Sequence, residues 1–245
     1  MLECAMVLAA GFGSRLGALT ATRPKPLISV NGKAVIDIVL DRIFSTNSIK
    51  KAIVNTHYLK DMMRAHLASS KYHDRILISE EDKILGTGGG ILHAMNRFSY
   101  AELLLHNSDI LILKGGNIAI ELIMKTWDPD RMDALLLLAP LGCQINKSLD
   151  QYADFLLSED NHIIKAPNNS TNGYKYVGIA ALSKKCMANI SSTTFPITNI
   201  LFQSQIETYR RYRFYGVVLP KDVLWCDIGS TDSLALTEDY LIHAI

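Results

Sequence analysis

The chain has 245 residues and a formal net charge of +1, which gives no electrostatic reason to expect nucleic acid or an anionic membrane as its main partner. Hydrophobic residues make up 49% of it, enough for a substantial core, yet no apolar run approaches the roughly 20 residues that cross a bilayer. Because the first twenty residues also lack a basic segment, we expect a soluble cytoplasmic protein with one domain over residues 1–245.

The first predicted element is a short strand at residues 5–10, which breaks at Gly11 into a basic, glycine-rich loop. Gly11 and Gly13 carry no side chain, so their backbone N–H groups can approach an anion closely. Arg15 and Lys25 add full charges, and the prolines on both sides of Lys25 stiffen its backbone. This composition predicts a phosphate-binding loop.

Two common phosphate motifs do not fit this loop. The dinucleotide pattern G-x-G-x-x-G requires a third glycine where Leu16 stands. A Walker loop requires Ser or Thr after Gly-Lys, but Gly32-Lys33 is followed by Ala34. On the residues alone, a glycine-rich turn with solvated basic side chains stays open as an alternative.

The next elements alternate between helix and strand. Apolar residues recur at helical spacing over residues 35–44 and 59–68, whereas the short apolar runs at 51–55 and 75–79 have strand character. The order β-α-β-α-β favours a parallel sheet that is covered by helices on both faces.

A helical pattern over residues 86–98 begins with Gly-Thr-Gly-Gly-Gly. Glycine inside a helix costs about 1 kcal/mol relative to alanine, so this run needs a reason. A flat nucleotide base lying against the glycine Cα atoms would supply one, and a tight contact with a neighbouring segment would supply another. The sequence leaves both open.

A fourth strand at residues 103–106 ends in Asn107-Ser108-Asp109. Ligands gather at the carboxyl ends of the strands of a parallel sheet, so we expect Asp109 beside the loop that begins at Gly11. The remaining half is less regular. It contains predicted strands at 133–140, 174–182 and 214–219, a helical stretch at 197–206, and a closing helix that Ser230 caps.

Several motifs together resemble one enzyme family. Leu-Ala-Ala-Gly-x-Gly-x-Arg at residues 8–15, followed by Pro-Lys-Pro-Leu at 24–27, resembles the signature of the sugar-1-phosphate nucleotidylyltransferases. Residues 85–91, 107–109, 176–179 and 225–230 are similar to further motifs of that family. The Thr-Gly-Gly-Gly form of residues 87–90 is similar to the branch that acts on N-acetylmuramate 1-phosphate or mannose 1-phosphate.

The resemblance implies a Rossmann-like α/β fold with a mixed, mainly parallel sheet, helices on both faces and no β-helix extension. It also implies a nucleotide-binding part at about residues 1–110 and a sugar-binding part at about 111–245. The implied reaction joins a nucleoside triphosphate (NTP) and a sugar 1-phosphate to give a nucleotide sugar and pyrophosphate. UTP with N-acetylmuramate 1-phosphate is the first expectation. GTP with mannose or heptose 1-phosphate, or a catalytically silent nucleotide-sugar-binding regulator, is the alternative.

The resemblance also implies roles for individual residues. Arg15 and Lys25 are the implied catalytic residues, and Asp109 and Asp227 are the implied ligands of Mg²⁺. The implied nucleotide-binding residues are Leu8, Ala10, Gly11, Gly13, Ser14, Thr87, Gly88 and Gly89. The implied sugar-binding residues are Asn107, Tyr176 and Gly178. Lys165 stands near the place of a lysine that reaches the sugar phosphate in many relatives; its role stays open, as does assembly into a homo-oligomer.

Overall fold

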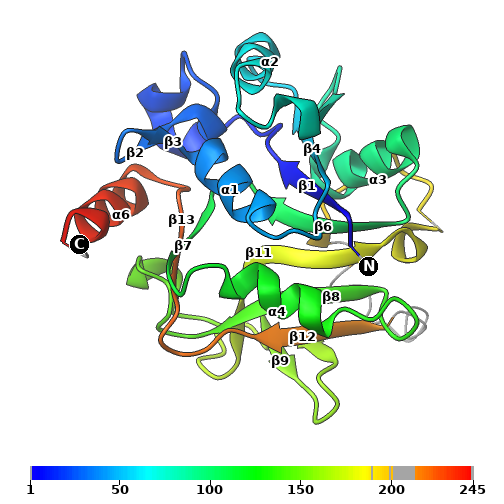
Figure 1. Ribbon diagram of the computed structural model, residues 1–245. Coiled ribbons are helices and arrows are strands. Elements are labelled where there is room, and N and C mark those ends of the chain that lie inside the picture. Colours follow the sequence, from blue (N-terminus) through cyan, green and yellow to red (C-terminus); the bar gives the residue numbers. More distant parts are fainter. Residues whose placement is uncertain (1, 189, 199, 201–212, 244–245) are drawn as a thin grey trace.

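The computed structural model describes residues 2–188, 190–198, 200 and 213–243, which form a mixed sheet of nine strands and its helices (Figure 1). The strands are β1 (Cys4–Leu8), β4 (Lys51–Thr56), β5 (Ile76–Glu80), β6 (Glu102–Asn107), β8 (Ala134–Pro140), β9 (Phe155–Leu157), β10 (Ile163–Lys165), β11 (Tyr174–Ser183) and β12 (Phe214–Val218). Their order is β10-β9-β11-β6-β1-β4-β5, and β8 pairs with both β11 and β12. This mixed α/β sheet confirms the predicted fold class.

The amino-terminal half of the sheet is parallel. β1 pairs in parallel with β4 and β6, and β4 pairs in parallel with β5. The helices α1 (Val35–Phe44), α2 (Lys60–Ala68) and α3 (Gly86–Phe98) connect these strands. The predicted helix at 35–44 is thus confirmed residue for residue, because its apolar stripe packs on the sheet.

The two faces of the parallel strands carry separate hydrophobic clusters. Val7 of β1 packs with Val39 of α1 in one cluster, whereas the neighbouring Met6 packs with Ile91 of α3 in the other. Alternate residues of a strand point to opposite faces, so β1 is buried on both sides. Figure 1 shows α1 on one face of the sheet and α3 on the other.

The carboxyl-terminal half of the sheet is largely antiparallel. β11 runs antiparallel to both β6 and β8, and β12 pairs in parallel with β8. The sequence pattern did not predict β7 (Ile110–Lys114), α4 (Ile118–Thr126), β9 or β10. Residues 201–206 of the helix expected at 197–206 lie outside the described residues.

A separate two-stranded sheet joins distant parts of the chain. β7 pairs antiparallel with β13 (Leu224–Asp227), and Asp227 lies opposite Ile110. Ile228 N also donates to Asp109 O at 2.8 Å, so this ladder holds Asp109 and Asp227 at one end. The helix α6 (Thr231–His243) follows, and the Ser230 hydroxyl accepts a hydrogen bond from Ser233 N at 3.2 Å, which confirms the predicted cap.

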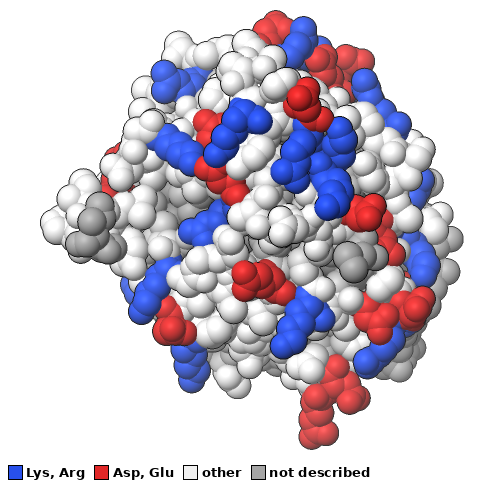
Figure 2. All heavy atoms as spheres, viewed as in Figure 1, with Lys and Arg blue, Asp and Glu red and all other residues white. Residues whose placement is uncertain are grey.

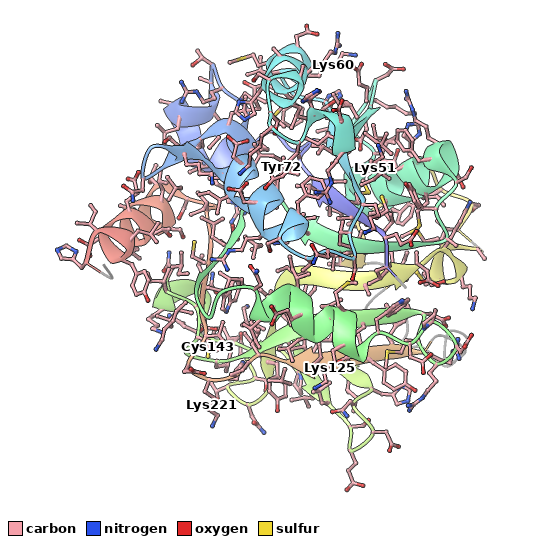
Figure 3. The ribbon with its side chains drawn as sticks, in the orientation of Figure 1. Lys51, Lys60, Tyr72, Lys125, Cys143 and Lys221 are labelled. Carbon is pink, nitrogen blue, oxygen red and sulfur yellow. The ribbon has the colours of Figure 1, made fainter. Side chains whose placement is uncertain are left out.

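The surface carries charges of both signs. On the face that Figure 2 shows, Lys and Arg side chains are interspersed with Asp and Glu. Tyr72, labelled in Figure 3, follows α2, and its hydroxyl donates to the Asp41 carboxylate of α1 at 2.9 Å. Within the described ranges, no helix has both the length and the apolar character that a membrane span requires.

Candidate active site

The predicted phosphate-binding loop begins where β1 ends. Gly13 has a φ of +67°, and a Cβ atom there would lie 2.9 Å from Lys25 Cβ. Glycine alone satisfies both the left-handed backbone and the close approach of Lys25. The Thr20 hydroxyl closes the turn by donating to Gly13 O at 3.0 Å.

This loop lines a cavity of about 200 Å³, which we call the loop cavity. Its walls bring together the predicted phosphate-binding residues and the end of β6. They consist of Leu8, Ala9, Gly11, Gly13, Ser14, Arg15, Lys25, Pro26, Ser108, Asp109 and Gly229. The expectation that Asp109 lies beside the loop is confirmed, because parallel β1 and β6 end at the same edge.

Lys25 lies between the two predicted metal ligands. Its Nζ donates a hydrogen bond to Asp109 Oδ2 and lies 3.9 Å from Asp227 Oδ1. We call these three residues the Lys25 cluster. Arg15 lies next to it, since a Cβ atom on Gly229 would be 3.0 Å from Arg15 Nη2 and 2.8 Å from Asp227 Oδ1. Four charged groups therefore meet at one end of the loop cavity.

The electrostatics of Asp227 are unusual. Burial, together with the neighbouring Asp109 carboxylate, raises the pKa of Asp227 to about 6, and Lys25 and Arg15 oppose that rise only in part. Asp227 Oδ1 is buried and accepts no hydrogen bond from the described residues. A cation at this position would compensate both the buried charge and the unsatisfied oxygen.

The protein's own donors to a metal ion are few. Within the described part of the chain, no group of three or more His, Cys, Asp or Glu residues could hold a metal. Mg²⁺ commonly binds through one or two carboxylates and takes its other oxygens from water and substrate phosphates. The pair Asp109 and Asp227 fits that pattern.

A second cavity of about 220 Å³ adjoins the first, and we call it the Thr87 cavity. It shares Leu8, Gly11 and Asp109 with the loop cavity, so the two cavities are neighbours. Its lining residues are Leu8, Ala10, Gly11, Asn55, Glu81, Ile84, Gly86, Thr87, Asn107 and Asp109. Six of the predicted residues thus lie at this cavity: Leu8, Ala10, Gly11, Thr87, Asn107 and Asp109.

Gly88 and Gly89, which were predicted to bind the nucleotide, pack against the segment that contains Thr193 and Phe195. Both are buried, neither lines the loop cavity or the Thr87 cavity, and their N–H groups donate to Phe195 O at 3.0 and 3.1 Å. A Cβ atom on Gly88 would clash with the Phe195 ring, and one on Gly89 would clash with Thr193 O. Of the two explanations that the sequence left open, packing accounts for these two glycines.

Of the three predicted sugar-binding residues, Asn107 alone lines the Thr87 cavity. Tyr176 and Gly178 are on β11 and do not line either cavity, and burial raises the pKa of the Tyr176 hydroxyl. Gly178 lies in close contact with the Asn107 side chain, because a Cβ atom on Gly178 would lie 2.7 Å from Asn107 Nδ2. Lys165 is exposed on β10, which three strands separate from β1.

Two polar residues of the Thr87 cavity were not predicted from the sequence as site residues. Asn55 is near the end of β4 and Glu81 directly follows β5, and both are 3% exposed. The rule that identified Asp109, a polar residue at the carboxyl end of a parallel strand, would have identified both.

Fold and site together define a nucleotidyltransferase, and the chain belongs to the nucleotidyl transferase family, which matches residues 4–131. The chain is 42% identical, over 99% of its length and 98% of the relative's, to an N-acetylmuramate alpha-1-phosphate uridylyltransferase from Caulobacter vibrioides. It is 22% identical, over 98% and 99% of the two chains, to a D-glycero-alpha-D-manno-heptose 1-phosphate guanylyltransferase from Aneurinibacillus thermoaerophilus. These matches confirm the family that the motifs indicated.

A solved structure confirms the fold independently of close sequence similarity. HddC from Yersinia pseudotuberculosis, complexed with GMP-PN, superimposes with a TM-score of 0.73 at 18% identity. The match covers 97% of this chain and 99% of that one.

Proposed function

We propose that this protein transfers a uridylyl group from UTP to N-acetylmuramate 1-phosphate and releases pyrophosphate. The observation that carries the proposal is the position of the Lys25 cluster, where the loop cavity meets the Thr87 cavity. The choice of UTP and N-acetylmuramate 1-phosphate is supported by the relative at 42% identity, whose name states that activity.

The chemistry needs positioning more than it needs a protein nucleophile. A phosphate oxygen of the sugar 1-phosphate forms a bond to the α-phosphorus of UTP, and the bond from that phosphorus to the oxygen bridging to the β-phosphate breaks. Both reactants are polyanions, so repulsion and misalignment are the main obstacles. In our proposal Lys25 donates to the α-phosphate and Arg15 binds the β- and γ-phosphates.

Asp109 and Asp227 are the proposed ligands of one Mg²⁺ ion. The buried, unsatisfied Asp227 Oδ1 and its raised pKa support a cation at this point. When bound, the ion supplies charge neutralisation between the α-phosphate and the attacking phosphate. Lys25 then adds a second, fixed positive charge that the protein itself provides.

In this proposal, the two halves of the chain bind different substrates. Residues 1–110 bind the nucleotide: the loop contacts the phosphates through Gly11, Gly13 and Ser14, and the base lies in the Thr87 cavity. Residues 111–245, with Asn107 at the boundary, bind the sugar phosphate. Leu8, Ala10 and Thr87 shape the base end, and Tyr176 and Gly178 shape the sugar end.

A pyrophosphate-release assay with four NTPs against several sugar 1-phosphates tests the function. We expect the highest kcat/KM for UTP with N-acetylmuramate 1-phosphate. A preference for GTP with mannose or heptose 1-phosphate would replace the substrates but keep the reaction. Nucleotide binding without pyrophosphate release from any pair would favour a silent regulator.

A further inference from the structure

Asn55 and Glu81 form a buried pair in the wall of the Thr87 cavity. Asn55 Nδ2 donates to Glu81 Oε1 at 2.7 Å, and both side chains belong to residues only 3% exposed. The two residues lie at the ends of neighbouring parallel strands, β4 and β5. The pair thus spans the edge of the sheet at which the cavity opens.

Each member of the pair also holds a backbone N–H group of one cavity wall. Ala9 N donates to Asn55 Oδ1 at 2.7 Å, and Leu85 N donates to Glu81 Oε2 at 3.0 Å. Ala9 leads from β1 into the phosphate-binding loop, and Leu85 precedes Gly86 and Thr87. One chain of hydrogen bonds therefore joins the two walls.

The pair requires two unfavourable features, a glycine at position 90 and a buried carboxylate at position 81. A Cβ atom on Gly90 would lie 2.6 Å from Glu81 Oε1 and 2.9 Å from Asn55 Nδ2. Glycine inside α3 is unfavourable for the helix. Burying the Glu81 carboxylate is also unfavourable, because the side-chain amide of Asn55 and the backbone N–H of Leu85 donate to it without adding a positive charge. A pair that served packing alone would be better replaced by apolar side chains.

We propose that Asn55 and Glu81 are positioning residues that set the spacing between the phosphate-binding loop and the Thr87 wall. This inference rests on the proposed function, since it takes the Thr87 cavity to receive the nucleotide base. The pair touches the nucleotide walls and not the sugar side, so it acts on NTP binding rather than on sugar 1-phosphate binding.

The hydrogen-bond pattern allows a sharp test because it needs one carboxylate and one amide, in either order. Glu81→Gln turns an amide N–H₂ group toward Asn55 Nδ2 or Leu85 N, so a donor faces a donor. Asn55→Asp brings two carboxylates together. In the double variant, Asp at position 55 accepts from Ala9 N and from the new Gln amide, whose oxygen accepts from Leu85 N, so the chain is complete again.

Steady-state kinetics of the four proteins, with calorimetric binding of a non-hydrolysable UTP analogue, measures the effect. We expect each single variant to raise KM for UTP and the analogue Kd about tenfold, with KM for the sugar 1-phosphate changed less than about twofold. The double variant should return to within about threefold of wild type. Glu80→Gln is the matched control: Glu80 lies next in sequence and pairs with Lys60 and Arg64 on the surface.

A double variant that binds the analogue as weakly as the single variants would overturn the inference. Equal increases in both KM values would overturn it too, because they indicate a general loss of structure. If a single variant fails to fold, the double variant is compared with wild type alone. Analogue binding within about threefold of wild type then supports the inference, and weaker binding overturns it. A wild type that binds the analogue but releases no pyrophosphate refutes the proposed function instead, while the binding data still judge the pair.

Discussion

At the residue scale, Lys25 is the side chain with the largest expected effect on turnover, because it contacts Asp109 and lies 3.9 Å from Asp227. Removing one charge-stabilising contact from a reaction centre typically costs about 3 to 4 kcal/mol. We therefore expect Lys25→Ala to lower kcat/KM about a hundred- to a thousandfold in the pyrophosphate-release assay.

Lys33→Ala is the control for this prediction. Lys33 pairs with Asp41 of α1 at the surface, outside both cavities, so its loss should leave kcat/KM within about twofold. Circular dichroism establishes that both variants are folded. Near-normal turnover in a folded Lys25→Ala protein would disprove the role given to Lys25.

We expect His106 to make the free energy of unfolding depend on pH. It is 3% exposed, its Nδ1 lies 2.7 Å from Asn107 O, and burial lowers its pKa from 6.5 to about 4. Between pH 6.5 and about 4, His106 binds a proton in the unfolded chain but not in the folded chain, so acidification favours unfolding. The free energy of unfolding should fall by up to about 3 kcal/mol as pH drops through this window.

Urea unfolding at several pH values across that window measures this slope. In a His106→Gln variant, whose side chain does not titrate, the part of the slope due to His106 should disappear even if the variant is less stable throughout. An identical slope in the two proteins would show that another group is responsible.

At the scale of elements, local sequence pattern predicted the amino-terminal half well and the rest less well. The apolar stripe of α1 and the short strands β4 and β5 follow from periodicity, which depends only on nearby residues. β7 and α4 were missed because residues 110–113 are all apolar and residues 118–124 are apolar except for Glu121, so neither period stands out. Gly115 and Gly116, with φ of +110° and +63°, mark the turn between them.

The pairing of β7 with β13 could not be predicted from the sequence. The motifs named Asp109 and Asp227 separately, and it is this ladder that brings them to one lysine. Pairing between distant segments depends on the whole fold and not on local preference.

The start of α3 provides a prediction at the same scale. Helix propensity alone says that Gly89→Ala stabilises the protein by about 1 kcal/mol. The new Cβ atom would, however, clash with the backbone oxygen of Thr193, and overpacking costs about 1 to 3 kcal/mol. Because a backbone atom cannot move aside alone, we expect net destabilisation, seen as a lower midpoint of urea unfolding.

Gly11→Ala is the matched control, because apart from its two chain neighbours no residue has an atom within 4 Å of the position of its Cβ among the described residues. It should leave the midpoint nearly unchanged. If Gly89→Ala were more stable than wild type, segment 193–197 would not pack on α3 as described.

At the scale of the whole molecule, the sheet determines where chemistry can occur. β1, β4, β5 and β6 run parallel, so their carboxyl ends bring the phosphate-binding loop, Asn55, Glu81 and Asp109 to one edge. The antiparallel β11 then adds the second half of the chain beside β6. The sequence motifs predicted most of this site, but the packing role of Gly88 and Gly89 required the position of segment 193–197.

The proposed reaction depends on Asp109 and Asp227 binding one divalent ion together with the substrate phosphates. We would test this binding by titration with Mn²⁺, followed by electron paramagnetic resonance in the presence of a non-hydrolysable UTP analogue. We predict that Asp109→Asn and Asp227→Asn each weaken Mn²⁺ binding at least about tenfold, whereas Asp232→Asn on the exposed start of α6 does not. Wild-type Mn²⁺ affinity in either of the first two variants would contradict this proposal.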